Sequence, residues 1–202
     1  SKCLAKSKKL RGFINLNPLD LNCIQKLENG IKKLGFIGLK LHPRLQCFNL
    51  ENPKVKDLAS AAGNLGVPVL IDAFPDGTHL MQGFSPFKYS QLALSCPKTK
   101  FVWAHFGGHY VLDFMMLAKR LENVHMDFSY SLLYYKDSSV ISDIIYCMKS
   151  MKFQKIFYGS DYPDRPVIKS YQMSIEILKK HGLNEDELHK IMYLNSSNFF
   201  NL

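Results

Sequence analysis

Several residues that could perform acid–base or metal chemistry follow short apolar stretches of the kind that form buried β-strands. The clearest example is Asp161, which comes after the β-favouring run 156–158 and before Pro163 and Pro166, two residues that cannot continue a strand ladder. Parallel α/β enzymes place their chemistry at the carboxyl ends of strands. Asp161 is therefore a candidate functional carboxylate, although a solvated turn aspartate would give the same local pattern.

The same arrangement occurs at other predicted strand ends. The residues concerned are Lys40 and His42, Asp72, His105 and His109, Asp127 and Ser129, and Arg165 beside Asp161. Histidine nitrogens and carboxylate oxygens without thiolates suit a divalent metal such as Zn²⁺ or Mn²⁺, which lowers the pKa of bound water to about 7. A neighbouring histidine can then move the proton. The alternative is structural: His42 could cap its strand, and Lys40 could form an internal salt bridge.

Four other histidines are expected to lie outside this set. His79 falls in residues 73–85, which we interpret as a flexible, exposed loop. His125 alternates away from the strand-end residues, and His181 and His189 come at helix ends, where a cation offsets the helix dipole. We therefore do not assign these histidines to the site.

Six predicted strands would have to position these residues, and helical patterns or helix-length loops separate them. The strands cover residues 12–18, 36–43, 67–72, 101–105, 124–128 and 156–158. Such alternation predicts an α/β fold with a parallel sheet and right-handed crossovers, but does not distinguish an open sheet from a barrel. The last predicted helix begins at Asn184 and ends at Asn195. We see no linker or internal repeat, so we expect a single domain over residues 1–202.

The composition favours a globular protein. The 202 residues are 47% hydrophobic, and no apolar run approaches the length of a membrane span. The five cysteines show no CxxC spacing, which argues against a disulfide framework or a cysteine zinc site and favours a cytoplasmic location. The net charge of +9 is scattered over predicted helices and loops. Without a recognised motif it does not indicate nucleic-acid binding, and we expect no membrane partner.

The ordered set of motifs resembles the amidohydrolase superfamily, in particular its TIM-barrel branch of metal-dependent hydrolases related to aminocarboxymuconate semialdehyde decarboxylase and the dicarboxylate lactonases. The matching segments are 35–43, 101–108, 156–163 and the terminal helix ending at Asn195. By this resemblance Asp161 would be the strand-end metal ligand, and His105 would orient or deprotonate a metal-bound water. Asp72 stands where many relatives have a histidine ligand.

The chain departs from the family pattern at its beginning. The family's first strand ends in a His-x-His pair of metal ligands, and none of the seven histidines here forms such a pair. A family barrel also needs a strand before Gly12, so the resemblance implies an N-terminally incomplete TIM-like (β/α) barrel that lacks its first strand.

Two functions are compatible with this pattern. The first is a metal-dependent hydrolase of a small anionic ester, lactone or amide, or a decarboxylase of a carboxylic acid. Its predicted metal ligands are Asp161, Asp72 and His105, and its predicted substrate-binding residues are Lys40, His42, His109 and Arg165. The alternative is a degenerate, metal-free barrel that binds a small anion or serves as an oligomeric scaffold. A homo-oligomer is compatible with either function.

Overall fold

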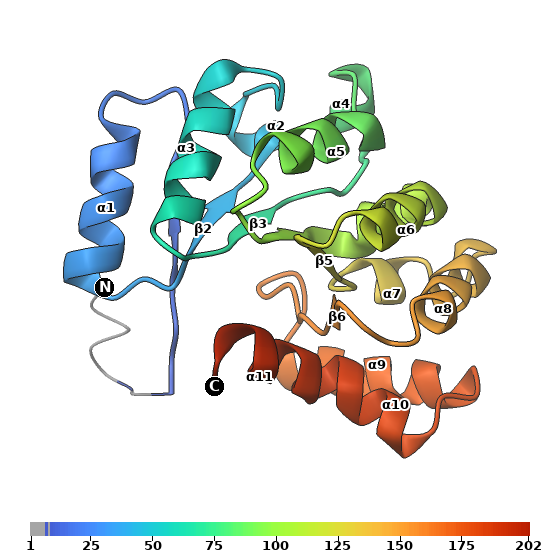
Figure 1. The fold of residues 1–202 in the computed structure, drawn as a ribbon. Helices are drawn as coiled ribbons and strands as arrows, with labels where there is room; N and C mark the ends of the chain where they lie inside the picture. The colour runs from blue at the N-terminus through green and yellow to red at the C-terminus, as the bar shows by residue number, and fades with distance from the viewer. Residues whose placement is uncertain (1–6, 8) are drawn as a thin grey trace. The chain divides into compact units, whose positions relative to one another are not determined.

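The computed structural model describes Ser7 and residues 9–202, which form two compact units. The first unit contains the chain up to Asp72 and Asp76–Val102, and the second contains Ala73–Pro75 and Trp103–Leu202. The chain is coloured by residue number in Figure 1. Cys3 lies outside the described residues. The single domain inferred from the sequence stays a prediction.

The first unit contains parallel strands whose order follows the chain. These are β1 (Phe13–Asn15), β2 (Gly38–Leu41), β3 (Val69–Ile71) and the first residues of β4 (Phe101–Trp103). Ile14 pairs with Leu39, and Lys40 pairs with Leu70. This arrangement confirms the predicted parallel pairing. It also brings the residues that follow β2 and β3 to the same edge of the sheet.

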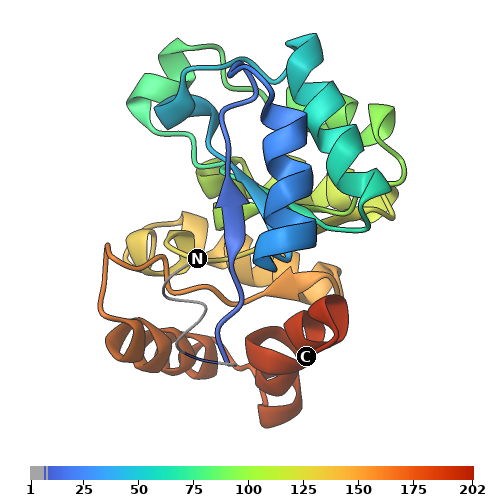
Figure 2. The ribbon, with the colours of Figure 1, turned by 90° about the vertical axis from the view of Figure 1, so that its left-hand side faces the viewer.

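Five helices connect these strands, and their boundaries follow from local capping chemistry. They are α1 (Cys23–Leu34), α2 (Pro43–Gln46), α3 (Pro53–Asn64), α4 (Gly77–Met81) and α5 (Pro86–Ser95). Gly35 ends α1 with a φ of 72°, and the Asn52 side chain accepts a hydrogen bond from Lys54 N at the start of α3. Helices α1 and α3 lie side by side (Figures 1 and 2).

The second unit continues the alternation of strands and helices. Its elements are α6 (Val111–Arg120), β5 (Val124–Asp127), α7 (Ser131–Tyr134), α8 (Val140–Ser150), β6 (Ile156–Phe157), α9 (Val167–Lys180), α10 (Glu185–His189), a π-helical turn (Lys190–Leu194) and α11 (Asn195–Phe200). Strands β5 and β6 are parallel, with Met126 opposite Ile156. Helices α6 and α8 lie against each other, and Phe114 of α6 and Ile144 of α8 are both fully buried.

Two local predictions were wrong. Residues 73–85 are not simply a loop, because Asp76 caps α4 by accepting a hydrogen bond from His79 N at 2.8 Å. His79 is consequently 6% exposed rather than solvated. The terminal helix does not end at Asn195 but continues through the π-helical turn into α11, since no glycine or proline interrupts residues 190–200. Figure 1 shows this continuous course at the red end of the chain.

Across Ser7 and residues 9–202, every helix is too short or too polar to cross a lipid bilayer.

Candidate active site

The turn after β4 presents His105 in a backbone conformation that few side chains adopt. His105 and Phe106 have φ values of 63° and 51°, and Gly107 and Gly108 continue with 70° and 58°. A Cβ at Gly107 would overlap the Phe114 ring, so glycine is required there on steric grounds as well. Non-glycine residues in this region are strained and persist where surrounding contacts enforce them, a situation common at functional sites.

Contacts with the residue segment that follows β5 fix the His105 ring. Its Nδ1 lies 3.0 Å from Ser129 O and 3.0 Å from Ser129 Oγ, and the residue is 6% exposed. A carbonyl oxygen can only accept a hydrogen bond, so Nδ1 must carry the proton. In the neutral ring the lone pair therefore lies on Nε2, the nitrogen that can act as a base.

Asp127 joins the ends of the two strands through one carboxylate oxygen. Its Oδ1 accepts hydrogen bonds from His105 N at 3.2 Å, from Ser129 N at 3.0 Å and from Ser129 Oγ at short range. Because the Ser129 hydroxyl donates to Asp127 and accepts a hydrogen bond from His105 Nδ1–H, it is not set up as a nucleophile activated by His105. The Asp127, Ser129 and His105 arrangement is thus a positioning network for the imidazole.

The end of β6 packs directly against this network. A Cβ at Gly159 would lie 2.9 Å from Ser129 Cβ and 3.8 Å from Asp127 Oδ1, which explains the glycine that precedes Asp161. Asp161 itself is exposed and has a φ of 55°. Aspartate tolerates this left-handed conformation better than most residues.

Tyr130 is a common neighbour of His105 and the Asp161 loop. Its ring meets the His105 ring edge-on, with centroids 6.1 Å apart. Burial, followed by the negative charge of Asp164, raises the pKa of Tyr130; Asp161 adds to this rise, and Arg165 opposes it. Three predicted residues therefore affect Tyr130: His105 contacts its ring, and the charges of Asp161 and Arg165 influence its pKa.

Aromatic side chains form a wall beside His105. Phe74 makes edge-on contacts with His105, Tyr130 and Tyr134 at centroid separations of 6.1, 4.9 and 5.5 Å. Nδ1 of the predicted substrate-binding His109 lies 3.3 Å from the hydroxyl of Tyr135. Arg165 pairs with Asp164, with Nε 3.4 Å from Oδ2.

The first unit contains a second pair of predicted residues, His42 and Asp72. Leu45 N donates to His42 Nδ1 at 3.5 Å, so the proton of the neutral ring lies on Nε2, which is 3.5 Å from Asp72 Oδ2. Asp72 is 3% exposed, and its backbone oxygen accepts a hydrogen bond from Tyr89 at 2.8 Å. Burial, followed by the negative charge of Asp72, raises the pKa of Tyr89 well above its usual value. Lys40 is half-buried on β2.

These residues do not by themselves form a metal site. Within Ser7 and residues 9–202, no three His, Cys, Asp or Glu side chains lie together in a way that could hold an ion. The His105 Nδ1 is also committed to Ser129. The assignment of Asp161, Asp72 and His105 as metal ligands stays a prediction.

Sequence reasoning missed the roles of Asp127, Ser129 and Tyr130. It placed Asp127 and Ser129 at a strand end but did not predict that they hold His105. The available signal was the spacing of two residues between Asp127 and Ser129, which directs both side chains to one face where the strand ends.

Comparisons with known proteins identify the family. The amidohydrolase family model matches residues 2–202. The structure resembles that of an uncharacterised TIM-barrel protein from Bordetella bronchiseptica, with a TM-score of 0.83, 15% identity and coverage of 98% of this chain and 70% of the other. No curated protein matched.

Two further solved structures are similar to this chain. A probable 2-pyrone-4,6-dicarboxylic acid hydrolase from Acinetobacter baumannii has a TM-score of 0.69, 18% identity and coverage of 100% of this chain and 77% of the other. A 5-carboxyvanillate decarboxylase from Novosphingobium aromaticivorans, complexed with manganese, has a TM-score of 0.67, 15% identity and coverage of 99% of this chain and 66% of the other. The chain belongs to the amidohydrolase family and is an enzyme of the α/β TIM-like barrel class.

Proposed function

We propose that this enzyme hydrolyses a small anionic ester, lactone or amide, and that His105 moves the proton of the attacking water. The observation that carries this proposal is the fixed imidazole. Its Nδ1 donates to Ser129 O, so Nε2 is the nitrogen left to accept a proton. Family membership supports hydrolysis as the reaction type.

An anionic substrate is supported by the positive charge of the chain and by the basic side chains among the predicted site residues. The net charge is +9, and Arg165 and Lys40 are the proposed partners of a substrate carboxylate, with His42 and His109 as further substrate-binding residues. The similar structures from Acinetobacter and Novosphingobium hold citric acid and a nitrobenzoic acid derivative, both carboxylic acids.

Decarboxylation is the second candidate reaction. The similar protein from Novosphingobium is a decarboxylase, and this chain shares its fold. The two reactions differ in their product, because decarboxylation releases CO₂ whereas hydrolysis of an ester, lactone or amide releases a new carboxylic acid group. Product analysis with matched lactone and carboxylic-acid substrates separates them.

Metal dependence is the part of the proposal that needs a direct measurement. Amidohydrolase family members generally depend on a divalent metal, and zinc or manganese is the proposed ion. The described residues do not form a preassembled set of three ligands, so we derive no catalytic step through the metal. Elemental analysis of the purified protein should find stoichiometric zinc or manganese. Its absence, together with anion binding without turnover, would support the degenerate, metal-free barrel instead.

The role of His105 can be tested with His105→Asn. The asparagine amide nitrogen can replace Nδ1 as the donor to Ser129 O, asparagine tolerates the left-handed backbone, and the base at Nε2 is lost. We expect kcat to fall about 100-fold to 10,000-fold on any lactone or ester that the native enzyme hydrolyses.

The matched control is His189→Asn, which changes an exposed histidine at the end of α10 and should leave kcat unchanged. Far-ultraviolet circular dichroism checks that both variants are folded. Native turnover by folded His105→Asn would rule out the proposed role.

A further inference from the structure

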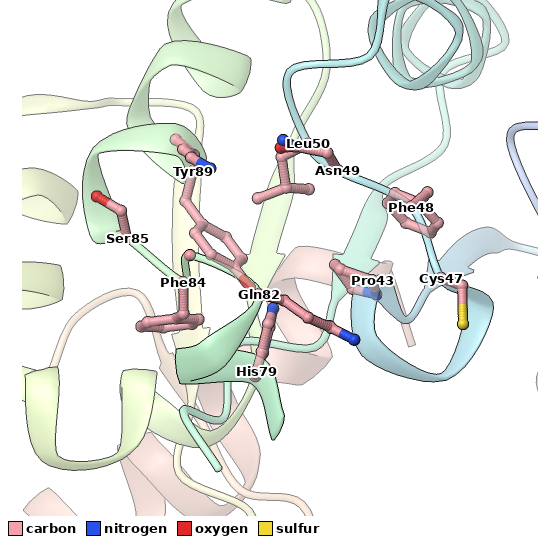
Figure 3. Close-up of a pocket in the computed structure, with 12 residues that line it drawn as sticks. Pro43, Cys47, Phe48, Asn49, Leu50, His79, Gln82, Phe84, Ser85 and Tyr89 are labelled. Carbon is pink, nitrogen blue, oxygen red and sulfur yellow. The ribbon is translucent and has the colours of Figure 1, made fainter. Parts of the chain in front are cut away.

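The first unit contains a pocket of about 270 Å³ that none of the candidate active-site residues lines. It lies among segments that follow β2 and β3, and Figure 3 shows it with its lining side chains. The lining residues are Pro43, Cys47, Phe48, Asn49, Leu50, His79, Gln82, Gly83, Phe84, Ser85, Lys88 and Tyr89. A cavity of this kind, with apolar walls and a few polar groups, is typical of small-molecule sites.

The apolar walls of the pocket are fixed before any ligand binds. The Phe84 ring contacts the rings of His79 and Tyr89 at centroid separations of 4.8 and 5.5 Å, and the Tyr89 hydroxyl is tied to Asp72 O. In Figure 3 the Tyr89 ring points toward His79 and Gln82. A flat apolar group could therefore enter with little rearrangement of the aromatic side chains.

Hydrogen bonds and an ion pair also hold together the loops that carry these walls. Arg44 Nε, on α2, lies 2.9 Å from Asp76 Oδ2, while Asp76 Oδ1 caps α4 through His79 N. His79 is 6% exposed, so one side of the pocket is made by a buried residue on a capped helix. The pocket is thus supported by two short helices rather than by an unsupported loop.

The polar part of the lining favours an anion. The twelve lining residues, all within the described chain, include Lys88 but no aspartate or glutamate. Lys88 Nζ is 3.1 Å from Glu51 Oε2, and this hydrogen bond, followed by the charge of Lys88, lowers the pKa of Glu51. An ammonium group has three donors, so Lys88 can keep Glu51 and still bind a second acceptor.

We propose that this pocket binds a small aromatic carboxylate, with the ring against the Phe84 and Tyr89 walls and the carboxylate at Lys88. The combination of aromatic walls and one cation explains this choice. Inorganic phosphate would satisfy the cation but gain nothing from the walls, and a neutral aromatic amide would use the walls but lose the charge. None of the residues proposed for hydrolysis lines this pocket, although its Tyr89 wall donates a hydrogen bond to Asp72 O. The proposal does not depend on the hydrolytic reaction.

Benzoate, benzamide and inorganic phosphate are the probes that test the proposal on the full chain. In two-dimensional ¹H–¹⁵N NMR titrations, benzoate should give saturable shifts in the backbone amides of residues 79–89. Benzamide should bind more weakly, and phosphate should leave these amides unshifted. Benzoate shifts that are confined to other parts of the chain, or equal binding of phosphate, would overturn the proposal.

The Lys88→Gln variant tests the cation. We expect the dissociation constant for benzoate to rise about threefold to tenfold, corresponding to the loss of one partly exposed, charge-assisted hydrogen bond. Glu51→Gln combined with Lys88→Gln removes the carboxylate that the single variant leaves without its lysine. The matched control is Lys98→Gln, an exposed lysine outside the pocket, which should bind benzoate as the native protein does.

A blocking variant gives an independent result. Gln82 is exposed and lines the pocket, so Gln82→Trp can place an indole in the cavity without removing a buried contact. Benzoate shifts should disappear in this variant while circular dichroism remains native. Unchanged binding by Gln82→Trp, or by both Lys88 variants, would contradict the assignment of the ligand to this pocket.

Discussion

His105 depends on two neighbours that themselves do no chemistry in the proposed reaction. Ser129 accepts a hydrogen bond from Nδ1–H, and Asp127 accepts hydrogen bonds from the serine and from the His105 backbone. The sequence predicted that His105 would lie at a strand end, because an apolar strand and a glycine pair flank it. It could not predict the anchoring, since these contacts join residues 22 and 24 positions apart and require the left-handed turn.

Replacing Ser129 with alanine tests how strongly this network stabilises the fold. Asp127 is 8% exposed and would keep two backbone donors while losing the hydroxyl. We expect Ser129→Ala to lower the free energy of unfolding by about 1–3 kcal/mol, because a buried carboxylate loses a partner. Urea unfolding measures this change.

The control for that measurement is Ser142→Ala, an exposed serine on α8. Alanine is favoured in helices, so this variant should be neutral or slightly stabilising. A neutral result for Ser129→Ala would show that water replaces the hydroxyl and that the network contributes little to stability.

At the scale of elements, capping residues were predictable and tertiary interactions were not. Asn52 caps α3, and Asn184 and Glu187 form a capping box at α10; each cap depends on residues within one turn and can therefore be read from the sequence. Helix α4 was missed because its capping signal at Asp76 lies in a segment rich in glycine and proline. The sequence predicted that Asn195 ends the helix. In the structure the helix continues, and the Asn195 side chain binds backbone oxygens in another part of the fold.

Asn195 connects the terminal helix to the residues around β6. Its Nδ2 donates to Phe153 O at 2.7 Å and to Ile156 O at 2.9 Å. We expect Asn195→Ala to reduce the free energy of unfolding by about 1–3 kcal/mol, since two backbone carbonyls lose their donor. Thermal and urea unfolding both report this loss.

Asn198→Ala is the matched variant, because Asn198 is an exposed asparagine on the same helix. It should change stability by less than about 0.5 kcal/mol in the destabilising direction, as is usual for surface substitutions. Equal effects of the two variants would mean that the Asn195 contacts are not specific stabilising interactions.

At the scale of the molecule, the alternation of strands and helices was enough to predict an α/β fold with parallel pairing, which both units confirm. The barrel class came from the resemblance and the comparisons rather than from the alternation. Periodicity reports which face of an element is buried, but it does not report closure of a sheet. For the same reason the metal ligands could not be derived from strand-end positions alone.

The net charge of +9 gives a prediction for the whole chain. The sequence predicts no dedicated nucleic-acid surface, and on that basis binding to DNA or RNA should be weak and confined to low salt, because it would come from counterion release alone. Fluorescence anisotropy with a labelled duplex and a labelled single strand should show no binding at about 0.15 M salt, a concentration at which exposed charges are largely screened. Tight, sequence-dependent binding at that salt concentration would show that the sequence-based exclusion of nucleic-acid partners is wrong.

The tethered imidazole also restricts how a catalytic cycle can be completed. If the His105 ring had to flip during each catalytic cycle, the hydrogen bonds between Nδ1 and Ser129 would have to break every time. The strained turn and the buried serine instead hold the ring in one orientation. In the proposed reaction Nε2 then both accepts and releases the proton, so the attacking water and the leaving group have to approach the same nitrogen of the ring.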